Sequence, residues 1–275
     1  MPAYQSIDHV ILRLHAAEPW FDLLTKTFAL PTAWPLQHAE FATYGWVHVG
    51  NTDLELWAAA SNADLPDHAQ PPLFHGFALE PALPMPDALA HLVAAGIACK
   101  PARAFQTLDI DGNKVTNFTN SVVLGVSSPS CCMFLCEWDA HASIYPWTEA
   151  DTPVTRRAVL SKALRDSGGG PLGLVGLNAI RIGTPDRDEH LRQWKSLSGS
   201  GSHPVQLTPE IVLELVPAEH LQVESLGFAV RSLEVARQFL SSRQWLDANS
   251  GNMLTISRQG LTVQLTEVAP HTHRG

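Results

Sequence analysis

The sequence has few charged residues for its length and no concentration of positive charge. Asp, Glu, Lys and Arg make up 16% of its 275 residues, and 27 acidic against 18 basic side chains give a net charge of −9. Arg156 and Arg157 form the largest basic cluster. Because phosphate backbones are bound by concentrated Lys and Arg surfaces, this composition argues against nucleic acid as a partner.

Long apolar runs are also missing. No run approaches the roughly 20 apolar residues that cross a bilayer, so we expect no membrane association. Residues 1–5 lack the basic region and apolar stretch of a signal peptide, which favours a cytoplasmic protein. The four cysteines, Cys99, Cys131, Cys132 and Cys136, do not follow the spacing of a disulfide scaffold. Cys131, Cys132 and Cys136 could be soft-metal ligands, but their apolar surroundings favour reduced, buried thiols.

What the sequence does contain is a repeated pattern. Residues 6–14 and 74–79 both alternate apolar side chains as strands do, and each has one histidine near its start, His9 and His75. Each run is followed by a helix-like segment and later by a strand-like run with a single glutamate, Glu55 and then Glu137. We interpret this as one metal site built by two-fold repetition.

The same unit recurs along the chain. The hydrophobic fraction of 45% predicts a compact globular protein with one large or two ordinary domains. Apolar periodicity and the positions of Gly and Pro predict four copies of one supersecondary unit, with a polar boundary region at 139–171. The expected strands are 7–14, 34–37, 41–49, 53–57, 73–79, 98–105, 117–126, 132–138, 174–182, 211–216, 225–230, 253–257 and 261–266, and the expected helices follow Pro19 and cover 86–95, 186–197 and 233–240.

Two imidazoles with one or two carboxylates form a nitrogen and oxygen donor set. Such a set suits Zn, Ni, Mn, Co or Fe(II), and a face of two His and one carboxylate leaves coordination positions open for a substrate. The competing interpretation of each histidine is a hydrogen-bonded core residue. Arg13 shares the face of His9 and is a candidate to bind an anionic substrate group, or else a solvent-facing strand residue. Trp46 and Trp57 are candidates to line an apolar substrate pocket.

Several short motifs resemble the vicinal oxygen chelate superfamily, which includes glyoxalase I, fosfomycin-resistance proteins and extradiol dioxygenases. They are Asp8-His9-Val10, Gly50-Asn51-x-x-Leu54-Glu55-Leu56, the strand with His75, and Met133-Phe134-Leu135-Cys136-Glu137-Trp138. The last run is similar to the large glyoxalase-like domain subgroup. The resemblance implies an α+β fold of four βαβββ modules that form two tandem domains with half-open curved sheets.

The resemblance also implies domain boundaries and ligands. It places an N-terminal domain with the metal site at 1–140, a linker at 141–171 and a degenerate C-terminal domain at 172–275. It assigns the metal ligands to His9, His75 and Glu137, with Glu55 on a fourth, glyoxalase-type position. In the second half Asn178, Leu226 and Gln264 stand where ligands are expected and only Glu214 remains, so we expect that half to be structural.

The function that the resemblance implies is a divalent-metal-dependent lyase or isomerase. It would act on a small molecule chelated through two adjacent oxygens, with Glu55 or Glu137 as the general base. One alternative is an Fe(II) extradiol-type dioxygenase that uses the same triad. Another is a metal-free small-molecule binding or resistance protein. Either a monomer or a homodimer is compatible with the sequence.

Overall fold

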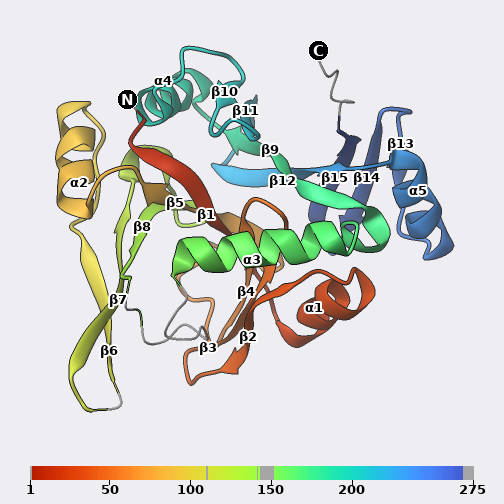
Figure 1. Cartoon of the computed structure of the whole chain (residues 1–275). Helices are drawn as coiled ribbons and strands as arrows, with labels where there is room; N and C mark the ends of the chain where they lie inside the picture. Colours follow the sequence, from red (N-terminus) through yellow and green to blue (C-terminus); the bar gives the residue numbers. More distant parts are fainter. Residues whose placement is uncertain (1, 110, 141, 143–151, 269–275) are drawn as a thin grey trace, which may run out of the picture.

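The chain forms two curved β-sheets with helices around them (Figure 1). The structure is a computed structural model that describes residues 2–109, 111–140, 142 and 152–268. The first sheet has the strand order β2-β3-β4-β1-β5-β8-β7-β6 and the second has the order β10-β11-β9-β12-β15-β14-β13. The α+β class and the two half-open sheets expected from the sequence are therefore confirmed.

The strands of the first sheet come from the first half of the chain, and those of the second sheet from the second half. The first sheet consists of β1 (Tyr4–Arg13), β2 (Thr32–His38), β3 (Ala42–His48), β4 (Asp53–Ala59), β5 (Leu73–Pro81), β6 (Arg103–Leu108), β7 (Lys114–Val122) and β8 (Cys132–Trp138). The second consists of β9 (Leu174–Thr184), β10 (Val205–Gln206), β11 (Val212–Pro217), β12 (Gln222–Val230), β13 (Ala248–Asn249), β14 (Met253–Arg258) and β15 (Leu261–Glu267).

Each sheet is built from two similar modules. Within a module the first and last strands pair in parallel, as β1 does with β4 and β5 with β8, and the modules join through antiparallel pairs, β1 with β5 and β9 with β12. Three modules have three strands after the helix, whereas the third has only β10 and β11. The helical segments are α1 (Glu18–Asp22) with the following η1 (Leu23–Thr27), α2 (Met85–Ala94), η2 (Leu124–Val126), α3 (Pro153–Asp166), η3 (Gly170–Leu172), α4 (Arg187–Ser198) and α5 (Leu233–Ser242).

One continuous apolar core joins the two sheets. Trp194 of α4, which is fully buried, stacks on Phe77 of β5 with ring centroids 5.6 Å apart. Asn51, in the turn between β3 and β4, donates to the carbonyl oxygen of Leu177 at 2.8 Å and accepts from the amide of Leu177 at 2.9 Å. The second sheet thus packs directly on the first and fixes the turn that precedes β4.

The stretch expected as a polar linker contains a well-formed helix. α3 starts at a capping box in which the side chains of Thr152 and Thr155 satisfy each other's backbone amides. Leu160 and Leu164 of α3 are buried, and the helix contacts β2 and β3 of the first sheet and β9 of the second. In Figure 1 it lies across both sheets. Within the stretch expected as a linker, Pro153–Asp166 therefore form a helix packed on both sheets.

No helix in the described part of the chain is both long enough and apolar enough to cross a membrane.

Candidate functional site

A β-bulge in β1 brings two adjacent polar side chains together. Ile7 pairs with Leu79 of β5, but the next pair is His9 with Ala78, so Asp8 is an extra residue on the β1 side. Neighbours in a regular strand point to opposite faces; here Nδ1 of His9 donates to Oδ2 of Asp8 at 2.7 Å. The bulge therefore creates a carboxylate–imidazole pair that strand periodicity would not predict.

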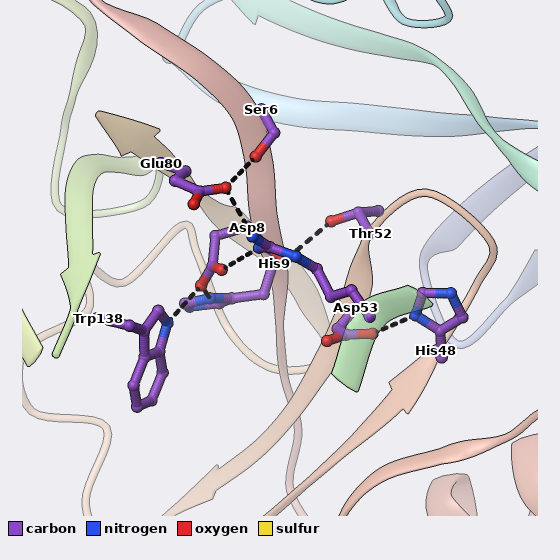
Figure 2. Close-up of polar contacts among 9 residues, drawn as sticks. Ser6, Asp8, His9, His48, Thr52, Asp53, Glu80 and Trp138 are labelled. Carbon is purple, nitrogen blue, oxygen red and sulfur yellow. Dashed lines mark hydrogen bonds and ion pairs between the residues drawn. The ribbon is translucent and has the colours of Figure 1, made fainter. Parts of the chain in front are cut away.

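The carboxylate of Asp8 accepts hydrogen bonds from side chains of several elements. The indole nitrogen of Trp138, at the end of β8, donates to Oδ2 at 3.0 Å (Figure 2). Nη1 of Arg157, from α3, donates to Oδ1 at 2.9 Å, and Nη2 of the same residue reaches Glu80 at 2.7 Å. Ser6 also donates to Glu80, at 2.6 Å. These contacts fix the carboxylate and through it the ring of His9.

The other ring nitrogen of His9 faces Glu55 of β4. Nε2 lies 3.5 Å from Oε2 of Glu55, and both side chains are buried. Trp46 of β3 packs against the imidazole with ring centroids 4.4 Å apart, and its indole hydrogen-bonds Glu55. The result is a chain of groups that runs from Arg157 through Asp8 and His9 to Glu55.

The charges in this chain shift the protonation of each member. Burial alone would raise the pKa of Asp8, but the hydrogen bond and charge of His9, with Arg157 and Trp138, lower it. Burial alone would lower the pKa of His9, but the bond to Asp8 and the charge of Glu55 raise it. Burial raises the pKa of Glu55, and His9 and Trp46 only partly offset this effect. His9 thus retains its proton readily, while the carboxylate of Glu55 is costly to keep charged.

His9 and Glu55 line a cavity of about 490 Å³ on the concave side of the first sheet. Its walls are mainly aromatic, and its size falls within the range of about 300–1,000 Å³ that is usual for small-molecule sites. The side chains that line it are His9, Ile11, Arg13, Trp34, Phe41, Tyr44, Trp46, Glu55, Trp57, His75, Phe105, Thr107, Phe118, Asn120, Phe134, Cys136 and Trp138. Among these described residues Glu55 is the sole carboxylate.

The cavity continues into a more open groove along the hairpin of β6 and β7. The groove shares Trp57, Phe105 and Phe118 with the cavity and is also lined by Arg103 and Lys114. Both of these basic residues are exposed. The outer end of the site is therefore positive and solvated, whereas its inner end contains the buried Glu55.

Comparisons with known proteins define the fold. No protein-family model and no curated protein matches the sequence. Homoprotocatechuate 2,3-dioxygenase from Brevibacterium fuscum is similar in structure, with a TM-score of 0.60, 11% identity, and coverage of 96% of this chain and 72% of that chain. Homoprotocatechuate 2,3-dioxygenase from Arthrobacter globiformis gives a TM-score of 0.59 at 12% identity, over 97% of this chain and 80% of that one.

A hypothetical protein from Staphylococcus aureus aligns over 96% of this chain and 99% of its own, with a TM-score of 0.57 and 9% identity. The dioxygenases belong to the vicinal oxygen chelate superfamily. The chain has the vicinal oxygen chelate fold. Identities this low show the architecture alone, so the chemistry of this chain depends on its own side chains.

Vicinal oxygen chelate domains have an internal two-fold repeat, and the register shows which residues correspond. In β1 and β4, His9 pairs with Asp53 and Ile11 with Glu55; in β5 and β8, Gly76 pairs with Cys132 and Ala78 with Phe134. Across the repeat, His9 faces Ala78 and Ile11 faces Gly76. A two-fold axis that exchanges β1 with β5 also exchanges these two pairs, so it relates His9 to Gly76 and Ile11 to Ala78. Because Ile11 pairs with Glu55 and Ala78 with Phe134, the same axis relates Glu55 to Phe134. Neither Gly76 nor Phe134 has a metal-binding side chain.

His75 lines the cavity but does not complete a ligand set with His9. It lies at a second irregularity of the β1–β5 pairing, beside Gly76, whose φ of +123° suits glycine. Nε2 of His75 bonds the carbonyl oxygen of Pro129 at 2.8 Å. Burial, with a smaller effect from the charge of Arg13, lowers the pKa of His75. The ring is thus neutral and anchored to the chain.

Glu137 points away from the cavity. Phe134, Cys136 and Trp138 of β8 line the cavity, so Glu137 lies on the opposite face of the strand. Its Oε2 accepts from the amide of Met85 at 3.2 Å, at the N-terminus of α2. In the second half of the chain, Oε2 of Glu267 likewise accepts from the amide of Leu233, at the N-terminus of α5, at 2.8 Å. In both domains this glutamate satisfies a helix terminus, where a negative charge is stabilising. The expectation that Glu137 acts as a ligand or base is corrected accordingly.

The donor set does not fit the metal centre that the sequence predicted. His9 and Glu55 are the two donors that converge. The position that the two-fold relates to Glu55 is occupied by Phe134, whose ring contacts His9 edge-on with centroids 5.7 Å apart. In the described ranges no three His, Cys, Asp or Glu side chains are grouped to hold a metal ion. The structure therefore does not bring His9, His75 and Glu137 together around one ion.

Residues 174–268, the described part of the second sheet and its helices, have no such set either. Asn178 donates to Thr266 at 2.7 Å, and Leu226 is buried in the core. Gln264 lines a shallow pocket with Glu214, whose carboxylate lies 4.0 Å from Arg181.

The guanidinium of Arg13 is bound by hydrogen bonds to the loop after β4. It donates to Asp64 at 2.7 and 3.1 Å, to Asn62 at 3.1 Å and to the carbonyl oxygen of Ser61 at 3.0 Å. It fixes that loop and has little capacity left for an anionic ligand. Trp46 and Trp57 do line the cavity, and Trp57 stacks on Tyr44 at 5.6 Å between centroids.

The sequence did not reveal the roles of Asp8, Phe134, Trp138 and Arg157. Asp8 was hidden because adjacent strand residues are expected on opposite faces. Arg157 was visible only as half of a basic pair, with nothing to show that α3 brings it to Asp8. The Asp8-His9 dipeptide within the strand-like run 6–14 was the one available signal.

Proposed function

We propose that the N-terminal domain binds a flat organic cation in its aromatic cavity and does so without a metal ion. Glu55 is the observation that carries this proposal. It is the single carboxylate among the described lining residues, it is buried, and aromatic rings surround it. A buried carboxylate with a raised pKa is stabilised by an incoming positive charge.

The walls favour the same class of ligand. Aromatic faces carry partial negative charge and attract cations within about 6 Å, with Trp the most effective. Trp34, Trp46 and Trp138 form a cluster with centroids 5.5 to 6.3 Å apart, and flat rings of this kind accept a flat ligand by stacking. The cavity therefore complements a planar cation in both shape and charge.

Among the described residues, no basic side chain at the inner end is left to pair with an anionic group. Arg13 is neutralised by Asp64, and His9 lies between Asp8 and Glu55. Arg103 and Lys114 are at the exposed groove, where water and salt weaken their field. An acidic substituent on the ligand would thus lie at the outer end, with the cationic group innermost beside Glu55.

The metal-dependent functions expected from the sequence have less support. A lyase or isomerase of the glyoxalase type and an Fe(II) dioxygenase both need at least three protein ligands on one ion. The described residues bring two together, and a phenyl ring occupies the related position. The metal-free binding function weighed at the sequence level is the one that this geometry favours.

Proton transfer without a metal is a second candidate, favoured by the hydrogen bond from His9 to Asp8 and the ion pair of His9 with Glu55. A carboxylate with a raised pKa beside an oriented imidazole is suited to removing and returning a carbon-bound proton. This candidate predicts exchange of an acidic C–H of the bound ligand for deuterium in D₂O, observable by proton NMR. If a ligand binds tightly and shows no exchange, proton transfer is contradicted and binding remains as the function.

The test of the binding proposal uses three probes of similar size and different charge: 4-aminoquinolinium, naphthalen-1-amine and 1-naphthoate. Calorimetry and quenching of tryptophan fluorescence are measured on protein dialysed against a chelator. The cation is expected to bind most tightly and the anion most weakly. Glu55→Gln should weaken the affinity for the cation by about 10- to 100-fold, the usual effect of losing a hydrogen bond to a charged group. The affinity for the neutral amine should change little.

Two results would contradict the proposal. One is tighter binding of 1-naphthoate than of 4-aminoquinolinium. The other is an affinity for the cation that is the same in wild type and Glu55→Gln. Glu137→Gln is the matched control, since this carboxylate is on the opposite face of β8 and should not affect any of the three probes.

A further inference from the structure

A second cavity lies between the two sheets, away from Glu55. Its volume is about 110 Å³, and it is enclosed by side chains of α1, β1 and β4 on one side and of β12, β14 and β15 on the other. Apart from Arg258, every described side chain in its wall is aliphatic or aromatic. An apolar cavity of roughly 150 Å³ is known to stay dry and to bind benzene, so a space of this size suits a small apolar group.

Some of the side chains that line this cavity keep a small exposure to solvent. Leu24, Leu30, Leu54 and Phe228 face it and retain 6 to 8% of their exposure. Leu56, Leu79 and Leu135, in the core of the first sheet, are fully buried. These four wall residues thus keep a small contact with solvent, whereas the three leucines of the first sheet have none.

Two arginines lie on the rim. The guanidinium of Arg258 is 4.9 Å from the ring centroid of Trp245, which lines the cavity, and that of Arg243 is 5.6 Å from the same ring. In the described part of the chain neither guanidinium is within ion-pair distance of a carboxylate. The nearby Asp247 accepts a hydrogen bond from the amide of Ser257. Among the described residues, the two positive charges at the rim thus have no acidic partner.

We propose that this cavity binds a short amphipathic anion. The apolar tail, with about six carbons, would fill the space between the sheets, and a carboxylate head would lie between Arg258 and Arg243. Guanidinium groups bind carboxylates through paired hydrogen bonds, and their stacking on Trp245 holds them at the rim. The ligand would contact both domains and so stabilise their association.

The test compares hexanoate with 1-hexanol, which has a tail of the same length and no charge. Binding is followed by calorimetry and by the fluorescence of the full-length protein. Hexanoate is expected to bind more tightly than 1-hexanol, and affinity should rise about fourfold per methylene from butanoate to hexanoate, then level off once the cavity is full. Arg258→Gln and Arg243→Gln should each weaken the affinity for hexanoate by about tenfold and leave the affinity for 1-hexanol unchanged.

Two further variants separate this site from the one around Glu55. Val263→Phe fills the cavity and should abolish binding of both hexyl probes, while Glu55→Gln should leave both affinities unchanged. Equal binding of hexanoate and 1-hexanol in the wild type would overturn the proposal. Undiminished binding of hexanoate in the Arg258→Gln, Arg243→Gln double variant, or its displacement by 4-aminoquinolinium, would also overturn it.

Discussion

Asp8→Asn is the change that most directly probes the network behind the cavity. Asp8 is 4% exposed and accepts from His9 at 2.7 Å, from Arg157 at 2.9 Å and from Trp138 at 3.0 Å. The variant keeps the shape but removes the charge, so Arg157 retains only Glu80 and protonated His9 retains only Glu55 as a counter-ion. Breaking a buried charge pair in this way typically costs about 3–5 kcal/mol of folding free energy. That is a large part of the roughly 5–15 kcal/mol that stabilises a typical domain.

The pH dependence of this loss follows from the two pKa shifts. The pKa of His9 is raised in the folded state, so its contribution to stability is present at low pH and is lost as pH rises through that value. The pKa of Asp8 is lowered, so its contribution is lost as pH falls through that lower value. The difference between wild type and Asp8→Asn should therefore be largest between these two pKa values and smaller above that of His9.

Urea denaturation at several pH values measures the free energy of unfolding, and NMR titration of the His9 ring measures its pKa. Asp166→Asn is the control, because it breaks an exposed pair with Lys162 and should cost less than about 1 kcal/mol. A loss in Asp8→Asn no larger than in this control, together with an unchanged pKa of His9, would refute the proposed network.

Three further predictions concern the cavity and the two-fold repeat. Affinity for 4-aminoquinolinium should fall as pH falls through the raised pKa of Glu55, because a neutral carboxyl cannot pair with a cation; calorimetry across pH checks the direction. Phe134→Glu places a third donor beside His9 and Glu55 and should create an affinity for Zn²⁺ or Co²⁺ that the wild type lacks; the visible spectrum of bound Co²⁺ would reveal it. Glu137→Gln weakens the start of α2 and should cost about 1 kcal/mol, measured by thermal unfolding, with no change in ligand affinity.

The architecture could be predicted because it depends on periodicity. Alternating apolar residues mark β1, β4 and β5 clearly, and glycine and proline separate them from the helices. The four modules follow from the repetition of this pattern. The two-residue strands β10 and β13 and the helix α3 were missed. α3 is mostly polar and is held by two buried leucines, Leu160 and Leu164, and it contacts strands that are distant in sequence.

The site could be predicted only in part because bulges change the face on which a side chain lies. In a regular strand a shift of one residue moves every side chain to the other face. The irregularities at Asp8 and near Gly76 do this locally, so matching His75 to His9 by order along the chain selected the wrong partner. Glu137 lies next to two cavity residues, Cys136 and Trp138, and this one-residue offset turns it to α2 instead.

The most direct test of the central claim is the metal dependence of cation binding. Chelator-treated protein is titrated with 4-aminoquinolinium in a calorimeter, first alone and then after addition of one equivalent of Zn²⁺, Mn²⁺ or Fe²⁺ under nitrogen. We predict one binding event with an affinity that the metals change by less than about twofold, since Glu55 and the aromatic walls supply the interactions. Binding that appears only after a stoichiometric metal ion is added, and that disappears in His9→Ala, would contradict the account.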